Sequence, residues 1–369
     1  MKEKVRSYNV DLLRIISMMM VVTLHSLSRS EMLTETEGII FNLSWFLEIV
    51  CYGAVDIFLL ISGYFGVKSK FKLSRILSLW LQVVFYLITV EVILQVIHGE
   101  FHIIPILKTI TPVLSNQYWF FTCYFILCFF TPFINKLINE SSKQLNQVLF
   151  GILIFIFSVL PFIAMSPIAY AKEIDFFNVN RGYSVIWCTV VYTLGALLSK
   201  LEISQYFKKS TCFLNYWLGV FLTFGIWILC QKNDVYGYFA VSYTSPLIVF
   251  ASISLLLFFT KIKLNSTIEK IVKFFVPEVF SVYLIHSNPH IYTYYTNSVR
   301  YLLNYDFPII FLNLMIIILL VYMVSSIVEF IRLKLFSPID KWIKKIDQQK
   351  SIKCFVIHKV LCQIVLVDI

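Results

Sequence analysis

The 369-residue chain is 59% hydrophobic and only 14% charged, and its formal net charge is +10. Soluble domains average about 45–50% apolar and about 25% charged residues, so the composition excludes a soluble globular protein. Surplus Lys and Arg normally mark the cytoplasmic side of a membrane protein, so the positive charge does not indicate a nucleic-acid partner.

Apolar segments long enough to cross a bilayer as helices recur along the whole chain. They predict an all-α integral membrane protein with about ten transmembrane helices. The predicted spans are residues 8–28, 41–65, 76–97, 117–138, 147–167, 183–199, 212–230, 240–260, 278–297 and 307–331. The ninth is the weakest prediction because its sequence, "FSVYLIHSNPHIYTYY", is polar and rich in tyrosine.

The distribution of basic residues predicts the orientation of these spans. With both termini in the cytoplasm, the cytoplasmic segments hold 24 of the 31 Lys and Arg residues. Each cytoplasmic segment holds at least as many as the outside loops beside it, which is the pattern of the positive-inside rule.

The two ends of the chain need separate interpretation. Basic residues before the first apolar stretch resemble a signal peptide, but Arg14 interrupts that stretch and no A-x-A site follows. We therefore expect a retained first helix and one membrane domain over residues 1–335. Residues 336–369 read as a basic cytoplasmic tail, although part of it could form an amphipathic surface helix.

Most of the eight cysteines fall inside apolar segments. There is no CxxC pair, and no Cys/His cluster has the spacing of a metal site. We expect buried apolar cysteines, with neither a disulfide framework nor a bound metal.

The first predicted span carries three side chains that hydrocarbon disfavours. Arg14 and His25 are eleven residues apart, close to three helical turns, so they share a face about 16 Å apart along the axis. Asp11 lies one turn below Arg14. A charge at membrane depth costs at least about 2.5–3.5 kcal/mol, so this stripe predicts a polar path through the protein. A structural Arg14–Asp11 pair with His25 at the interface is the alternative interpretation.

The predicted depth of each residue in the membrane places further ionisable side chains near His25. Alternating helix directions place Glu48 and Glu91 in the outer part of the membrane with His25, and Asp56 somewhat inside the middle. A histidine beside carboxylates has the makings of a general base whose ring is oriented by a neighbour. A structural hydrogen-bonding role for Glu48 and Glu91 is an equal alternative.

The inner zone is predicted to be cationic. Arg14 and Arg75 fall near the cytoplasmic side, together with several lysines. Guanidinium groups match the geometry of phosphate oxygens, so this zone suits a phosphorylated cytoplasmic ligand.

At these residues the chain resembles the membrane-bound acyltransferase family 3. The family's first-helix signature of Arg, ten residues and His is matched by Arg14 and His25 in "YNVDLLRIISMMMVVTLHS". Its second-helix signature resembles "AVDIFLLISGYF", which carries over Asp56, Ser62 and Tyr64.

Three further segments extend the resemblance over roughly residues 5–335. The loop "KFKLSRILSLW" is similar to the family's basic loop at Arg75, and "QYWFFTCYFILCFFTPFIN" to its Trp-bearing fourth helix. "FSVYLIHSNP" is similar to its late Y-L-I-H segment at His286. Leu59 replaces a common Phe, which we expect to be neutral.

The resemblance implies transfer of an acyl group, usually acetyl from acetyl-CoA, onto cell-surface sugars. Together with the predicted depths, the resemblance leads us to expect two sets of residues. The catalytic set is His25, Asp56, Glu48, Glu91 and His286. The donor-binding set is Arg14, Arg75, Ser62 and Tyr64. His25 then acts as a general base on the acceptor hydroxyl, or carries the acyl group covalently. The Arg14–His25 separation is close to the length of the donor's pantetheine arm.

The expected acceptor is a capsular or other surface polysaccharide, or its lipid-linked precursor. Lys, Ile, Phe and Asn richness suggests an AT-rich bacterial genome, and we expect a multi-pass protein of the plasma membrane. The oligomeric state stays open, a homodimer included. A transporter or flippase for a lipid-linked sugar is the alternative, with the polar stripe as a proton relay.

Overall fold

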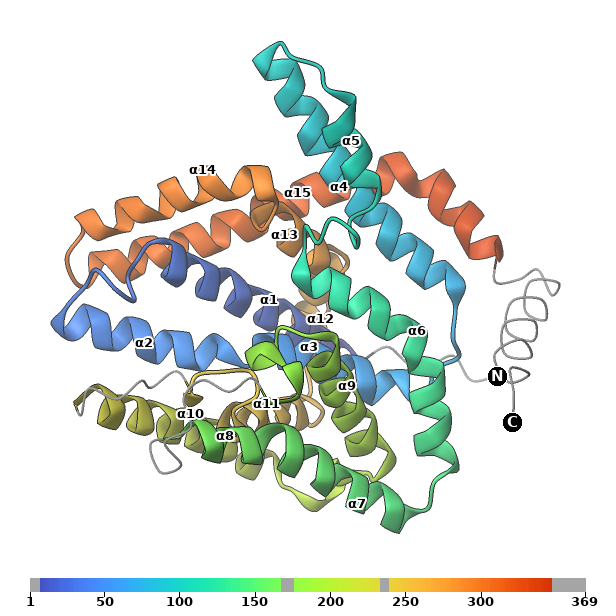
Figure 1. Ribbon diagram of the computed structural model, residues 1–369, viewed down its shortest axis with the longest axis vertical. Coiled ribbons are helices and arrows are strands. Elements are labelled where there is room, and N and C mark those ends of the chain that lie inside the picture. Colours follow the sequence, from blue (N-terminus) through green and yellow to red (C-terminus); the bar gives the residue numbers. More distant parts are fainter. Residues whose placement is uncertain (1–6, 167–175, 233–238, 347–369) are drawn as a thin grey trace.

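The computed structural model describes residues 7–166, 176–232 and 239–346, and every regular element in these residues is helical. The principal helices are α1 (Tyr8–Arg29), α2 (Gly38–Tyr52), α3 (Ala54–Gly66), α4 (Leu73–His98), α5 (Ile103–Ile110), α6 (Trp119–Glu140), α7 (Lys143–Ile154), α8 (Leu160–Met165), α9 (Val185–Lys200), α10 (Lys209–Lys232), α11 (Pro246–Phe259), α12 (Ser266–Phe275), α13 (Val279–His286), α14 (Pro289–Arg300) and α15 (Ile309–Ile346). Figure 1 shows them as one bundle with α1 in its middle, from which the end of α4 and α5 project.

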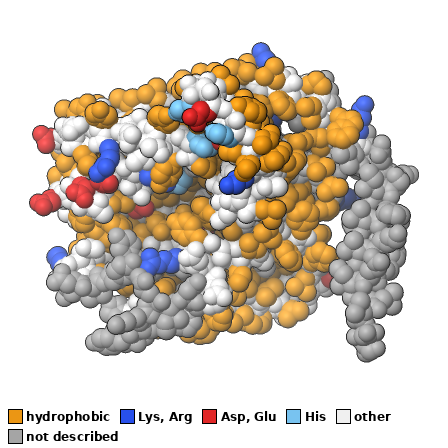
Figure 2. Space-filling view, turned by 45° about the horizontal axis from the view of Figure 1, so that its top comes forward, with side chains coloured by type: hydrophobic (Ala, Val, Ile, Leu, Met, Phe, Trp, Pro, Cys, Tyr) orange, Lys and Arg blue, Asp and Glu red, His pale blue; other side chains and the backbone are white. Residues whose placement is uncertain are grey.

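The predicted all-α membrane architecture is confirmed. Within the described residues, seven helical segments are long and apolar enough to cross a membrane, and α9 and α11 are shorter apolar helices. Hydrophobic side chains cover most of the face seen in Figure 2, with acidic and basic side chains in small groups between them. The total of ten spans and the cytoplasmic position of both termini stay predictions.

The ninth predicted span differs from a single helix. The chain forms α13, which ends at His286, and α14, which begins at Pro289. Pro289 has no backbone N–H to continue a helix, and the Asn288 side chain instead accepts a hydrogen bond from the backbone N–H of His290. The break follows from the Asn-Pro pair, and it leaves His286 at a helix end.

The second predicted span is also interrupted, between α2 and α3 at Gly53. A Cβ atom on Gly53 would lie 2.3 Å from the Ser252 hydroxyl of α11. That hydroxyl donates a hydrogen bond of 3.3 Å to the carbonyl of Gly53. The interruption is therefore held against α11 by a close contact with the Ser252 side chain.

The start of the predicted tail continues the last helix, because α15 runs without a break to Ile346. Residues 347–369 lie outside the described residues. The domain boundary at residue 335 stays a prediction.

Helices α3 and α9 approach each other closely through two glycines. A Cβ atom on Gly63 would lie 1.9 Å from the carbonyl oxygen of Tyr192, and one on Gly195 would lie 2.2 Å from that of Leu60. Small residues allow such backbone contact, on which helix association in a bilayer depends. Across this contact the Trp187 indole of α9 donates a 3.0 Å hydrogen bond to Asp56 of α3.

We expect Gly195→Ala to destabilise the bundle, because the new methyl group meets backbone atoms that cannot move aside. Overpacking of this kind costs about 1–3 kcal/mol, which lowers the midpoint of thermal unfolding in detergent by a few degrees. Gly151→Ala in α7 is the control, because no atom lies within 4 Å of its added Cβ. Equal midpoints for the two variants would contradict the proposed packing constraint.

Candidate active site

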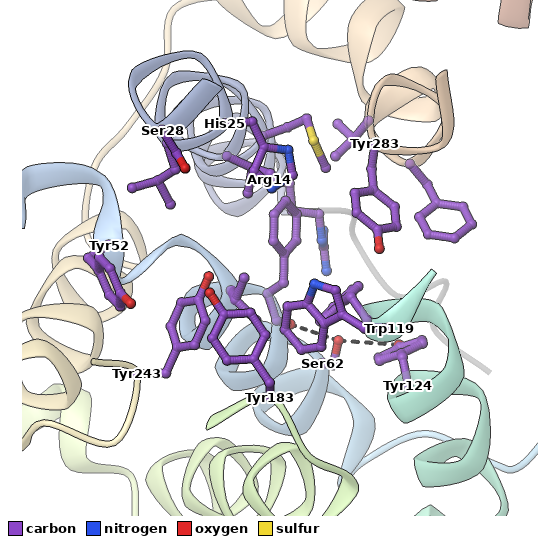
Figure 3. A pocket seen from close by; sticks show the side chains of 18 of the residues that line it. Arg14, His25, Ser28, Tyr52, Ser62, Trp119, Tyr124, Tyr183, Tyr243 and Tyr283 are labelled. Carbon is purple, nitrogen blue, oxygen red and sulfur yellow. Dashed lines mark hydrogen bonds between the residues drawn. The ribbon is translucent and has the colours of Figure 1, made fainter. Parts of the chain in front are cut away.

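A cavity of about 620 Å³ lies inside the bundle beside α1, and we call it the outer cavity. Side chains of α1, α2, α3, α4, α6 and α13 line it, joined by Tyr183 and Tyr243 from the segments before α9 and α11. Figure 3 shows Arg14, His25 and Ser28 on one side of the cavity, with Tyr183, Tyr243 and Trp119 on the other. Its volume falls in the range of small-molecule binding sites.

The predicted polar stripe of α1 faces this cavity. Arg14 and His25 both line it, and Met18 and Val21 lie between them on the same face. The Arg14 guanidinium also pairs with the carboxylate of Asp11. The Arg14–Asp11 pair of the alternative interpretation is present, but the paired Arg14 still lines the cavity, and so does His25, which that interpretation placed at the interface.

His25 is held by His286 across the space between α1 and α13. Nδ1 of His25 lies 2.9 Å from Nε2 of His286. Nδ1 of His286 in turn lies 2.5 Å from the carbonyl oxygen of Val282, one turn earlier in α13. His286 is buried, so this chain of contacts lies within the protein.

These contacts define which nitrogen carries each proton when both rings are neutral. The Val282 carbonyl can only accept, so Nδ1 of His286 donates to it and Nε2 of His286 accepts. Nδ1 of His25 must then be the donor to His286. The remaining lone pair of His25 is on Nε2, and no hydrogen bond formed by the described residues engages that atom. This is the tautomer that a general base requires.

Two predicted carboxylates lie on either side of the helix interruption at Gly53. Glu48 lines the outer cavity, is 8% exposed, and has one carboxylate oxygen without a hydrogen-bond partner. Asp56 is fully buried against the Trp187 indole and lines neither cavity described here. Glu48 therefore belongs to the site, whereas Asp56 joins α3 to α9.

A second cavity of about 520 Å³, the inner cavity, lies at the ends of α3 and α6 and the start of α4. Four basic side chains line it: Lys70, Lys72, Arg75 and Lys136. Among the described residues around it there is no Asp or Glu. The predicted cationic zone therefore corresponds to this cavity, and Arg75 is one of the residues that line it.

The two cavities meet at shared side chains. Ser62, Leu79 and Tyr124 line both of them. The hydroxyls of Ser62 and Tyr124 are 3.3 Å apart and hydrogen-bonded, as drawn in Figure 3. Arg14 lines the outer cavity and Arg75 the inner one, so the two arginines belong to different cavities.

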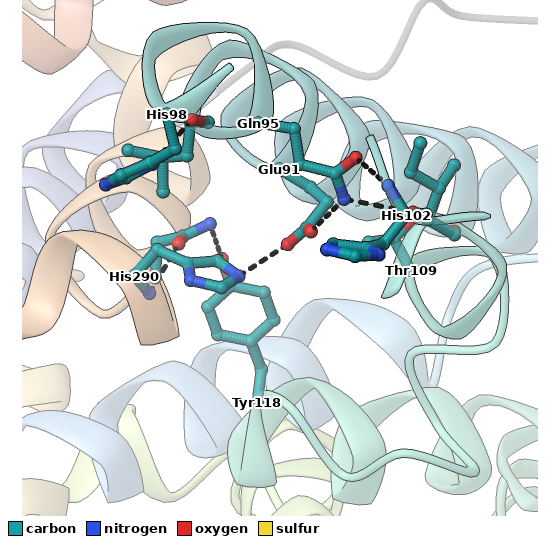
Figure 4. A network of polar contacts seen from close by, with 10 residues as sticks. Glu91, Gln95, His98, His102, Thr109, Tyr118 and His290 are labelled. Atoms are coloured by element: carbon teal, nitrogen blue, oxygen red, sulfur yellow. Dashed lines mark hydrogen bonds and ion pairs between the residues drawn. The ribbon is translucent and has the colours of Figure 1, made fainter. Parts of the chain in front are cut away.

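Glu91 lies apart from His25, in a separate polar cluster shown in Figure 4. Its carboxylate is 2.7 Å from Nε2 of His290 and accepts a 2.6 Å hydrogen bond from Gln95. Glu91 lines neither cavity, and Tyr64 does not line them either. The structure thus does not place Glu91 where it would orient the His25 ring.

Several residues that line the outer cavity are not identified by the sequence pattern. Tyr52, Tyr183 and Tyr243 line the outer cavity from positions at helix ends or between helices. Arg29, which the sequence places in an outside loop, lines it too. Tyr183 and Tyr243 could have been noticed as aromatic residues within short polar segments, "RGYS" and "VSYTS".

Comparison with known proteins defines the class of the chain as a membrane acyltransferase. A family model described as an acyltransferase domain matches residues 7–328. The chain therefore belongs to the acyltransferase 3 family, and the resemblance found in the sequence is confirmed. No curated protein and no solved structure matches it.

We expect His286→Phe to lower kcat for acyl transfer about 10- to 100-fold, since it removes a hydrogen bond worth about 1.5–3 kcal/mol to the developing imidazolium. KM for the acyl donor should stay unchanged, because His286 lines neither cavity. His286→Gln should recover part of the rate, since its amide oxygen can accept from His25.

His290→Gln is the matched control, because His290 contacts Glu91 and is outside both cavities. A rate for His286→Phe equal to that of His290→Gln would show that the contact between the two histidines is not needed for transfer.

Proposed function

We propose that this chain is a membrane O-acyltransferase of the plasma membrane. It moves an acetyl group from cytoplasmic acetyl-CoA to a hydroxyl of a surface polysaccharide or its lipid-linked precursor. The observation that carries the proposal is the junction at Ser62, Leu79 and Tyr124, where a cationic cavity meets one that contains a histidine base.

The inner cavity suits the nucleotide end of the donor. Coenzyme A carries several phosphate charges, and four basic side chains without a lining carboxylate provide the complementary field. Arg75 can bind a phosphate through two parallel hydrogen bonds, whereas the lysines supply point charges. The pantetheine arm then extends past Ser62 and Tyr124 toward His25.

Arg14 acts beyond the junction in this arrangement. It lines the outer cavity rather than the inner one, and Asp11 fixes its guanidinium. We therefore assign it to the end of the pantetheine arm that lies next to the phosphates, apart from Arg75, with which the sequence analysis grouped it. The rise of about 16 Å along α1 separates it from His25.

The chemical step uses the unengaged nitrogen of His25. Nε2 takes the proton from the acceptor hydroxyl while the oxygen attacks the thioester carbonyl carbon. The C–S bond breaks, and the coenzyme A thiolate leaves with the proton that Nε2 received. His286 stabilises the intermediate imidazolium by accepting from Nδ1, so His25 returns to its starting state after each turnover.

Removing the base should abolish the reaction. In membranes given radiolabelled acetyl-CoA, His25→Ala should lower label transfer to glycan by at least about 10²–10⁴-fold. His98→Ala is the control, because His98 is exposed on α4 and lines neither cavity. Direct transfer also predicts no labelled protein without acceptor. Unchanged glycan acetylation by His25→Ala would refute the mechanism.

Arg75→Ala should weaken donor binding and leave chemistry intact. Loss of a charge-assisted phosphate contact of about 1.5–3 kcal/mol raises KM for acetyl-CoA about 10-fold or more, with kcat nearly unchanged. Lys143→Ala, an exposed residue at the start of α7 outside both cavities, is the matched control. If both variants show the same KM, the inner cavity does not hold the donor phosphates.

A further inference from the structure

Four aromatic side chains form a continuous wall of the outer cavity, opposite α1 (Figure 3). Ring centroids of Trp119 and Tyr183 are 4.6 Å apart, those of Tyr183 and Tyr243 5.1 Å, and those of Tyr243 and Tyr52 5.0 Å. We call these four residues the aromatic wall. All four residues line the same cavity as His25.

The backbone holds this wall in place. Trp119 is the first residue of α6 and Tyr52 the last of α2, so each ring is anchored at a helix end. Gly182, with φ +105°, brings the segment of Tyr183 so close to Tyr243 that an added Cβ would lie 2.4 Å from the Tyr243 Cβ. A wall built this way presents its rings before any ligand arrives, which lowers the entropy cost of binding.

Glu48 adds an unsatisfied acceptor to the same cavity. Its side chain is buried, and one carboxylate oxygen has no hydrogen-bond partner. A buried carboxylate oxygen without a donor is costly, and Glu48, unlike Asp56, which also has an unpaired carboxylate oxygen, lines a cavity from which a donor can reach it. A ligand with hydroxyl groups would supply that donor.

The aromatic wall and Glu48 are separate from the inner cavity, which is assigned to the donor phosphates. None of these five residues lines the inner cavity with its four basic side chains. They line the same cavity as His25, which leaves them available for the second substrate.

We propose that the aromatic wall and Glu48 form the acceptor subsite. In this subsite a pyranose ring stacks on Trp119 and Tyr183, and one of its hydroxyl groups donates a hydrogen bond to Glu48. Aromatic faces bind the C–H faces of sugars, and a carboxylate fixes the rotation of the ring. With the ring so fixed, a neighbouring hydroxyl points at Nε2 of His25. This assignment rests on the proposed function.

The test measures both substrates separately in the full-length protein in lipid nanodiscs. The acceptor probe is the glycan fraction of the source cells, stripped of esters with mild alkali, and the donor is radiolabelled acetyl-CoA. Trp119→Ala and Glu48→Gln should each raise the half-saturating glycan concentration on the order of tenfold, with half-saturation by acetyl-CoA within about twofold of wild type. Arg75→Ala should show the reverse pattern.

Two controls separate acceptor binding from folding. Phe133→Ala removes an exposed ring of the same helix α6, outside both cavities, and should change neither constant. Trp119→Phe keeps a ring and should lie between wild type and Trp119→Ala. Unaltered binding of acetyl-CoA, measured by calorimetry, verifies that each variant is folded.

The outcomes distinguish the subsite from the function. Suppose that the wild type transfers label to glycan, but the Trp119 and Glu48 variants leave the half-saturating glycan concentration unchanged, or change the half-saturating acetyl-CoA concentration instead. The subsite assignment is then overturned, while the proposed function stands. If wild type places no label on glycan, the proposed function and the subsite both fail.

Discussion

The cost of placing charge in hydrocarbon is the constraint on which this structure depends. Arg14, His25 and Glu48 belong to helices that a bilayer surrounds, and each faces an interior cavity. A lipid-facing position would leave such groups without partners at a cost of several kcal/mol. The bundle is accordingly arranged around α1, which contacts α2, α3, α13 and α15. The need to keep charged and polar side chains out of hydrocarbon therefore shapes both the packing around α1 and the cavity that these side chains line.

The contact between His25 and His286 depends on an irregularity in the fold. Since α13 ends at His286, its last turn is shaped by the Asn-Pro pair that starts α14 rather than by a continuing helix. Asn288 also donates to the hydroxyl of Tyr118, which itself donates to the Leu284 carbonyl. The polar sequence that made the ninth span a weak prediction is therefore the part that supports the contact between His25 and His286.

Hydropathy and spacing predicted the all-α architecture and the stripe on α1 that faces a cavity. They did not predict the rotation of one helix against another, because lipid-facing and core-facing surfaces are both apolar in a membrane protein. That is why Glu48 and Glu91, placed at similar depth by sequence, differ in outcome: one faces the cavity and the other faces His290. Tyr183 and Tyr243 were missed because they precede helices, where no periodicity identifies a face.

The hydrogen bond between Ser62 and Tyr124 also bears on the ionic permeability of the membrane. A protein that joins a cytoplasmic donor to an outside acceptor would dissipate the proton gradient if its two chambers formed an open pore. The hydroxyls of Ser62 and Tyr124 are hydrogen-bonded at this junction, and Leu79 adds an apolar side chain to it. Under the proposed function, Ser62, Leu79 and Tyr124 would separate the two cavities when the donor is absent, and the pantetheine arm would pass between them when it is bound. Acyl transfer across the bilayer would in this way stay compatible with an energised cell.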